Sequence, residues 1–300
     1  MKFNIQDSSK NAIQSALLVL KLIIPLFILA EILLYLDVLK YISFIFEPIT
    51  NVLDLPKEAS IGIAAAMFFN IYAGLAFLAP LDLSPYEWTI LGTFLGIAHS
   101  LVVENVIMKK IGIPYWYSWS LRIGLAFLAI MPLKFMPKEY FQTIHIHTET
   151  IVQKVYISFT DMLFYALKDS LILSFKVIVI VTAIIFIMDY IKSRDIMQKY
   201  QKKTNSLFSI AAGLLLGITY GAGIIISEAK KGTLTKVDIF YIGTFLMICH
   251  SIIEDILLFV IFGANAWMIL AIRVGMAFIF SYILVILYKR TFHENSKIFK

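Results

Sequence analysis

GTFLGIAHSLVVEN at residues 92–105 recurs as GTFLMICHSIIEDI at residues 243–256, 151 positions further along the chain. When the alignment continues without a gap, 13 of the 36 positions over 92–127 are identical, and Arg122 falls on Arg273. Matches at histidine, serine, tryptophan and arginine rarely arise from an apolar composition alone. The chain therefore contains two related copies, and internal duplication is typical of transporter folds.

The composition excludes an ordinary soluble domain and a disordered chain. Of the 300 residues, 60% are hydrophobic and only 15% are charged, and the mean hydropathy is +0.85. Soluble globular proteins carry about 25% charged residues, and disordered chains are poor in apolar residues. The one cysteine, Cys249, excludes an intramolecular disulfide and a CxxC metal motif. We therefore expect an all-α, multi-pass protein of the cell (inner) membrane, in contact with the lipid bilayer.

Eight apolar segments approach the roughly 20 residues that a helix needs to cross the hydrocarbon layer. They lie at about 13–36, 61–79, 87–107, 115–136, 164–189, 207–227, 238–262 and 265–288. The repeat divides them into two membrane units, 1–136 and 163–300, joined by an amphipathic connector at 137–162. Each unit is predicted to contain a scaffold helix, a re-entrant helical hairpin, a polar broken helix and a final helix.

The re-entrant hairpins are assigned to the second segment of each copy. The segment at 61–79 carries Asn70 at its middle, and the segment at 207–227 carries Thr219 between glycines. Small and polar residues at mid-depth are typical of a hairpin tip, where protein or water satisfies the freed backbone groups. If both segments re-enter, each copy crosses the membrane three times and the second copy is inverted.

The distribution of basic residues favours this inverted topology, because cytoplasmic loops are enriched in Lys and Arg. Of the 26 basic residues, four lie inside apolar segments: Lys21, Arg122, Lys176 and Arg273. With three crossings per copy, 16 of the other 22 basic residues lie on the cytoplasmic side and 6 on the opposite side. With four crossings per copy, the corresponding numbers are 13 and 9. Both termini are then cytoplasmic. The surplus of six positive charges is spread over short loops, so we expect no nucleic-acid partner.

The third segment of each copy holds the densest set of polar residues, and ionisable groups inside a membrane tend to mark substrate or ion pathways. The set comprises His99, Ser100, Glu104 and Asn105 in the first copy, and His250, Ser251, Glu254 and Asp255 in the second. On a continuous helix His250 and Glu254 share one face. By the same geometry, His99 and Glu104 lie about 140° apart.

If the two segments meet, this set could hydrogen-bond a polar solute, carry a coupling proton or ligate a divalent cation. The candidate metal ligands are His99, Glu104, His250, Glu254 and Asp255. Each residue alone is also explained by hydrogen bonds that join helices, but the repeated pair of clusters favours a functional site. Arg122 and Arg273 could pair with these acids, bind an anionic group or snorkel to the interface.

Other features of the sequence are assigned to ordinary roles. Trp116, Trp267, Tyr115 and Tyr117 are predicted to lie in the interfacial aromatic belt, and His145 and His147 are predicted to be solvated. The sequence has no phosphate-binding P-loop, no GxSxG elbow and no HExxH zinc motif. We therefore expect no enzyme and no cofactor, apart from a coupling H⁺ or Na⁺ or a transported divalent cation.

The order of segments and the pattern GTFxxIxHSxxxE/D, over about residues 10–290, resemble a known family. They resemble the core of concentrative nucleoside transporters, and the gate or nucleoside recognition domain of ferrous iron transport B and spore maturation proteins. The resemblance implies that hairpin tips and broken helices contact the solute. The residues it singles out are Asn70, Thr219, Glu104, Asn105, Glu254 and Asp255.

Three functions follow as hypotheses. The first is a transporter that moves a small polar solute, nucleoside-like in the resemblance, by alternating access between the two copies. The second is a divalent-cation permease of the gate-domain type. The third is a membrane scaffold that recruits protein partners without transport. We also expect the chain to form a homo-oligomer.

Overall fold

The computed structural model describes residues 4–38, 41, 44, 46–141, 156–193, 210, 213–214, 221–223, 225–226 and 234–298. These residues form helices and connections, with no strand among them. Five helical segments are long and apolar enough to cross a membrane: Ile5–Tyr35, Pro85–Lys110, Phe159–Ile191, Lys236–Val260 and Ala266–Arg290. The expectation of an all-α membrane protein is confirmed.

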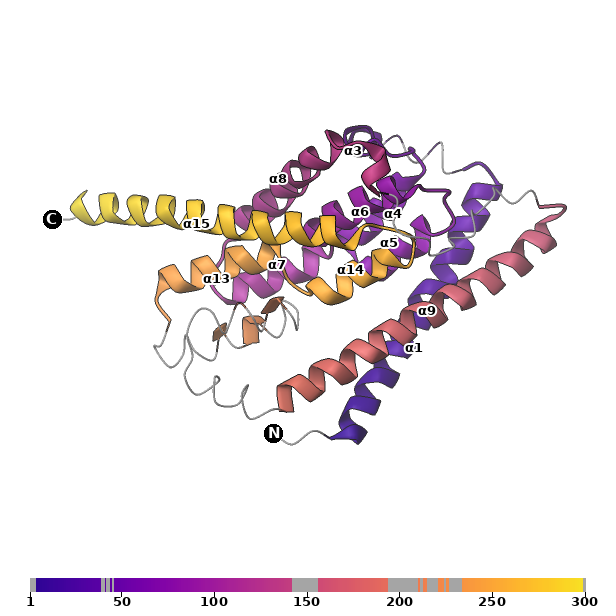
Figure 1. Ribbon diagram of the computed structural model, residues 1–300, viewed down its shortest axis with the longest axis horizontal. Helices are drawn as coiled ribbons and strands as arrows, with labels where there is room; N and C mark the ends of the chain where they lie inside the picture. The colour runs from indigo at the N-terminus through magenta and orange to yellow at the C-terminus, as the bar shows by residue number, and fades with distance from the viewer. Residues whose placement is uncertain are drawn as a thin grey trace.

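Helices α1 (Ile5–Tyr35) and α9 (Phe159–Ser193) lie side by side and run in opposite directions (Figure 1). Near the start of α1, the Ser8 hydroxyl donates to Asp189 Oδ2 at 2.9 Å, close to the end of α9. At the other end, the hydroxyl of Tyr156 donates to Glu31 Oε2 at 3.1 Å. Burial beside this carboxylate raises the pKa of the Tyr156 hydroxyl, which keeps the phenol protonated as a donor.

Both of these helices begin earlier than their apolar runs. Helix α1 starts at Ile5 rather than at residue 13, because the Asn4 side chain caps it by accepting from the backbone N–H of Gln6. Before α9, the Ser158 hydroxyl accepts from the N–H of Asp161. Capping residues therefore extend each helix by polar turns that hydropathy alone assigns to a loop.

The segment at 61–79 folds as a helical hairpin, as predicted. Helices α4 (Ala59–Phe68) and α5 (Ile71–Leu78) have 10 and 8 residues, too few for either to cross a bilayer alone. Asn70 lies at the tip, and its side chain caps α5 by accepting from the N–H of Ala73 at 3.0 Å. The second predicted hairpin lies largely outside the described residues.

The two broken helices form the centre of the protein. The first comprises α6 (Pro85–Ala98) and α7 (Leu101–Lys110), and the second comprises α13 (Lys236–Ile248) and α14 (Ile252–Val260). Capping boxes at Ser84 and Thr235 start α6 and α13. Glycines with positive φ, Gly112 and Gly263, follow the end of each broken helix.

The broken helices lie antiparallel to each other. At one end, the ring of Trp88 on α6 stacks on that of Phe262, just beyond α14, with centroids 4.2 Å apart. At the other end, the hydroxyls of Tyr117 and Thr244 lie 2.9 Å apart and join the region beyond α7 to α13. The two breaks are therefore brought to the same depth, midway between these contacts.

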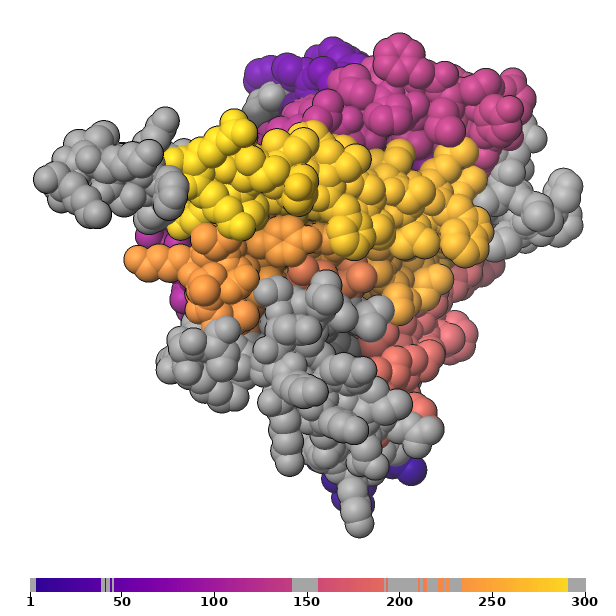
Figure 2. All heavy atoms as spheres, turned by 60° about the vertical axis from the view of Figure 1, so that its left-hand side comes forward, coloured from indigo at the N-terminus to yellow at the C-terminus, as the bar shows by residue number. Residues whose placement is uncertain are grey.

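Helices α8 (Tyr115–Lys134) and α15 (Ala266–Ile298) complete the packing around the broken helices. Helix α8 corresponds to the predicted segment at 115–136 but is not among the five spans selected by length and hydropathy. In Figure 2, α15 lies across one face, with α8 on one side and α13 on the other.

Trp116 and Trp267 are exposed near the starts of α8 and α15, whereas Tyr117 is partly buried against α13. Short helices α3 (Glu47–Leu53) and η2 (Lys138–Phe141) lie in connections.

Candidate functional site

Each broken helix is interrupted by a serine in the left-handed backbone conformation. Ser100 has φ 49° and ψ 34°, and Ser251 has φ 46° and ψ 34°. For residues other than glycine this conformation costs about 1–2 kcal/mol. The nearly identical angles at positions 151 apart mean that the duplicated motif encodes the same break twice.

Two buried arginines satisfy backbone carbonyls that the breaks release. Arg122 Nη2 donates to the carbonyl oxygen of His99 at 2.6 Å, and Arg122 Nε donates to that of Ile97 at 2.7 Å. Arg273 Nη2 donates to the carbonyl oxygen of His250 at 2.9 Å. Both arginine side chains are 0% exposed. Neighbouring side chains thus replace the lost helical hydrogen bonds, as membrane interiors require.

The same arginines form ion pairs with carboxylates on the second half of each broken helix. Arg122 Nη1 lies 2.8 Å from Glu104 Oε2, and Arg273 Nη1 lies 3.0 Å from Asp255 Oδ2. Glu104 and Asp255 occupy equivalent positions in the repeat. Of the three roles considered for Arg122 and Arg273, the structure therefore shows pairing with the acids.

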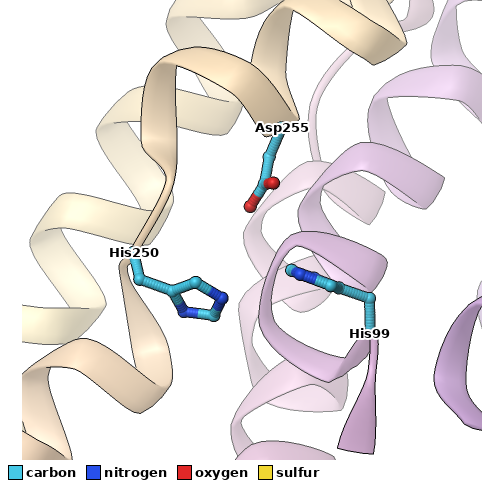
Figure 3. Close-up of side chains that lie close together, drawn as sticks. All are labelled: His99, His250 and Asp255. Carbon is cyan, nitrogen blue, oxygen red and sulfur yellow. The ribbon is translucent and has the colours of Figure 1, made fainter. Parts of the chain in front are cut away.

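The two histidines face each other across the interface between the broken helices (Figure 3). Their ring centroids are 5.2 Å apart. His99 Nδ1 lies 2.7 Å from the carbonyl oxygen of Leu95, and His250 Nδ1 lies 2.7 Å from that of Leu246. A carbonyl oxygen can only accept a hydrogen bond, so each Nδ1 carries the proton. Each Nε2 then faces the remaining side chains of the site.

Glu104 Oε1 lies between these two imidazoles. It is 3.2 Å from His99 Nε2 and 3.2 Å from His250 Nε2. On a continuous helix His99 and Glu104 would diverge; the left-handed turn at Ser100 brings them together. Asp255 completes the group, because one ligand atom each from His99, His250 and Asp255 lies within 4.8 Å of the others.

Glu254 contacts the first hairpin. The hydroxyl of Tyr72, on hairpin helix α5, donates to Glu254 Oε1 at 2.6 Å. The expected stacking of Glu254 on His250 assumes an unbroken helix, whereas the helix is interrupted at Ser251, between the two residues. Sequence reasoning gave Tyr72 no role; the signal that could have found it is its place two residues after the hairpin-tip residue Asn70.

The remaining candidates have structural contacts or lie outside the described residues. Asn105 is buried, and its Oδ1 accepts from the Ser118 hydroxyl. The backbone N–H of Ser100 donates to the carbonyl oxygen of Ala66 at 2.9 Å, which joins the first break to hairpin helix α4. Thr219, His145 and His147 lie outside the described residues.

The chain is similar to a membrane protein of Bacillus subtilis (strain 168), YvoD, itself described as uncharacterized. The two sequences are 27% identical over 271 residues, which cover 86% of each chain. No family model matches the sequence, and no solved structure matches it. Together with the five apolar helices, this likeness supports a membrane location.

In a membrane protein, the burial of this cluster has a high energetic cost, because no water is available to solvate ionised groups. His99, Glu104, His250 and Asp255 are each at most 7% exposed. The Arg122 and Arg273 ion pairs and the backbone hydrogen bonds offset part of that cost. The arrangement can accept hydrogen bonds, hold protons or ligate a cation at the junction of the two broken helices.

Proposed function

We propose that this protein is a transporter that moves a small polar solute by alternating access at the site between the two broken helices. The observation that carries the proposal is the meeting of His99 and His250 at two matched helix breaks. Transporters commonly build substrate sites from interrupted helices at mid-membrane, where freed backbone and ionisable groups meet the solute.

The antiparallel packing of the matched segments supports an inverted-repeat arrangement. Helices α1 and α9 run in opposite directions, as do the two broken helices. We assign these segments to two inverted-topology halves with both termini in the cytoplasm of the cell membrane. Related halves that exchange conformations would open the site to one side and then to the other.

The first hairpin is well placed to act as a gate in this cycle. Its helix α5 contacts α14 through the Tyr72–Glu254 hydrogen bond, and α4 contacts the first break through the Ala66–Ser100 hydrogen bond. Each is one hydrogen bond, worth about 0.5–3 kcal/mol, in addition to the packing of α4 against α6 and α7. Such contacts can break and re-form during a transport cycle.

The test is uptake by liposomes that contain the purified full-length chain, measured with labelled nucleosides and with divalent cations. We expect flux above that of protein-free liposomes, and loss of this flux in Glu104→Gln and Asp255→Asn. Asp82→Asn, at an exposed carboxylate, is the matched control and should retain flux. Absence of flux for every solute, or full flux in both buried-site variants, would contradict transport at this site.

A further inference from the structure

The geometry points to a binding site for one divalent transition-metal ion, formed by His99, His250 and Asp255 with Glu104 as the fourth ligand. The inference names the chemical class bound at the site of the proposed function and rests on that proposal for its role in transport. The binding itself is measured without transport.

The first argument is that three atoms able to ligate a metal, two imidazole nitrogens and a carboxylate oxygen, converge. Each Nδ1 donates its proton to a backbone carbonyl, so a neutral imidazole presents the Nε2 lone pair to the site. The ionised carboxylate of Glu104, paired with Arg122, also only accepts. At 3.2 Å from Glu104 Oε1, each Nε2 needs a positive charge between the two atoms: either its own proton, as in the hydrogen bond between His250 and Glu104, or a metal ion in the proton's place.

The second argument is that the hydrogen bonds of the histidines match those of metal ligands. Histidines that bind a metal through one nitrogen almost always donate the other N–H to a carbonyl or carboxylate, which fixes the tautomer and the ring orientation. His99 and His250 both do this through the carbonyl four residues earlier in the chain, at the same distance of 2.7 Å. Both rings are thereby oriented with Nε2 toward the site.

The third argument concerns distances. Zinc binds imidazole nitrogen at about 2.0–2.1 Å, and at a tetrahedral angle this places neighbouring ligand atoms roughly 3.3 Å apart. The two separations of 3.2 Å between Glu104 Oε1 and the histidine Nε2 atoms meet this requirement. In the group that includes Asp255, the ligand atoms lie within 4.8 Å of one another, so their separations must shrink by as much as about 1.5 Å.

The two arginines leave room for the ion. Arg122 contacts Glu104 Oε2, so that Oε1 faces the histidines. Arg273 contacts Asp255 Oδ2, so that the other carboxylate oxygen is available. Each carboxylate would then lie between a guanidinium and the ion, and outer-shell partners of this kind orient metal ligands.

The donor set selects the class of ion. Two imidazole nitrogens and two carboxylate oxygens suit zinc, cobalt, nickel and ferrous iron, whereas magnesium and calcium prefer oxygen ligands alone. His99 and Glu104 come from the first broken helix, and His250 and Asp255 come from the second. The ion would join the two halves, so its binding depends on their relative position.

The test uses the full chain purified through a tag without histidine, stripped with a chelator and titrated with Co²⁺. We expect one Co²⁺ per chain, with the visible spectrum of tetrahedral coordination, displaced by Zn²⁺ and not by Mg²⁺. His99→Ala/His250→Ala should weaken binding by at least about 100-fold, since even outer-shell changes cost 10–100-fold. His145→Ala/His147→Ala removes the same number of histidines and should bind as the wild type does.

Co²⁺ binding that is absent in the wild type, or unchanged in His99→Ala/His250→Ala, overturns the proposal. If the double variant does not fold, X-ray absorption of the zinc-loaded wild type tests the same point without a substitution. We expect imidazole and oxygen ligands at about 2.0–2.2 Å. Sulfur scattering, which would implicate neighbouring Cys249, or the absence of imidazole overturns the assignment.

Failure of the metal-site proposal can be distinguished from failure of the transporter proposal. A chain that carries nucleosides but binds no Co²⁺ or Zn²⁺ refutes the metal site and leaves transport standing. The acceptors at Glu104 would then share protons. A chain that binds one ion but produces no flux of any solute retains the metal site and refutes transport.

Discussion

Arg122 reaches Glu104 from the neighbouring helix α8, and the two side chains form an ion pair of 2.8 Å (Nη1 to Oε2) that is buried on all sides. The same guanidinium holds the carbonyl oxygens of Ile97 and His99. One side chain therefore joins the two halves of a broken helix, fixes the backbone at the break and positions the carboxylate that contacts both histidines.

Removal of this arginine should destabilise the protein strongly. Arg122→Gln leaves a buried carboxylate and two carbonyls without their partner, and breaking a buried pair in this way costs about 3–5 kcal/mol. The control is Lys134→Gln, at an ion pair with Asp54 of similar length, 3.0 Å, whose lysine side chain is 25% exposed. We expect that variant to lose about 1 kcal/mol or less. Thermal unfolding in detergent compares the two variants. Equal losses of stability would show that Arg122 contributes no more than an exposed ion pair does.

The left-handed serines predict a stabilising substitution. Ser100→Gly and Ser251→Gly relieve a conformation that is unfavourable for residues with a Cβ, so each should raise stability by about 1 kcal/mol. Ser120→Gly, at an exposed position inside helix α8, should instead lower it by about 0.5 kcal/mol, because glycine weakens a helix interior. The midpoint of thermal unfolding reports both. A fall in stability for both break-site variants would mean that the hydroxyls have a structural role.

Close packing of the first hairpin predicts that Gly74 tolerates no side chain. A Cβ at Gly74 would overlap the Cβ of Ala66 and lie 2.9 Å from the carbonyl oxygen of Gly62. Gly74→Ala should therefore separate α4 from α5 and cost about 1–3 kcal/mol. Gly275→Ala, where a Cβ meets nothing within 4 Å, should be neutral or stabilising. Proteolysis of the hairpin in folded protein would detect the separation.

The Tyr72–Glu254 contact predicts a change in hairpin opening. Tyr72→Phe removes the hydroxyl that donates to Glu254 Oε1 at 2.6 Å, and such a hydrogen bond contributes about 0.5–3 kcal/mol. We expect faster hydrogen exchange in α5 with little change in α6. Tyr282→Phe, at an exposed tyrosine of α15, is the control. Unchanged exchange in α5 would show that other contacts hold the hairpin closed.

The position of the site could be predicted from the sequence, but its connections could not. The repeated motif placed His99 and His250 at equivalent sites, and Asn70 marked the tip of the first hairpin. A broken helix was expected in each copy, but the position of the break at Ser100 was not, because no glycine or proline marks it and arginine from another helix stabilises it. The spacing of a continuous helix therefore predicts that His99 and Glu104 point apart, whereas in the structure His99 Nε2 lies 3.2 Å from Glu104 Oε1.

Long-range partners were equally beyond sequence reasoning. Tyr72 and Glu254 are 182 residues apart in the chain and meet because the hairpin packs against the second broken helix. Helix ends were also misplaced where polar capping side chains, such as that of Asn4, extend a helix beyond its apolar run. Hydrophobic periodicity in the sequence indicates which residues share one face of a helix, but it does not indicate which helix faces pack together.

The pairing of glutamate in one half with aspartate in the other introduces a difference of one methylene group. Glu104 is long enough to touch both imidazoles while it holds Arg122, whereas its counterpart Asp255 is shorter. A carrier made of two identical halves would have mirror-image states of equal free energy facing the two sides of the membrane. In the proposed transporter, the shorter carboxylate makes the two halves of the site unequal, so the states open to opposite sides of the membrane would differ in free energy.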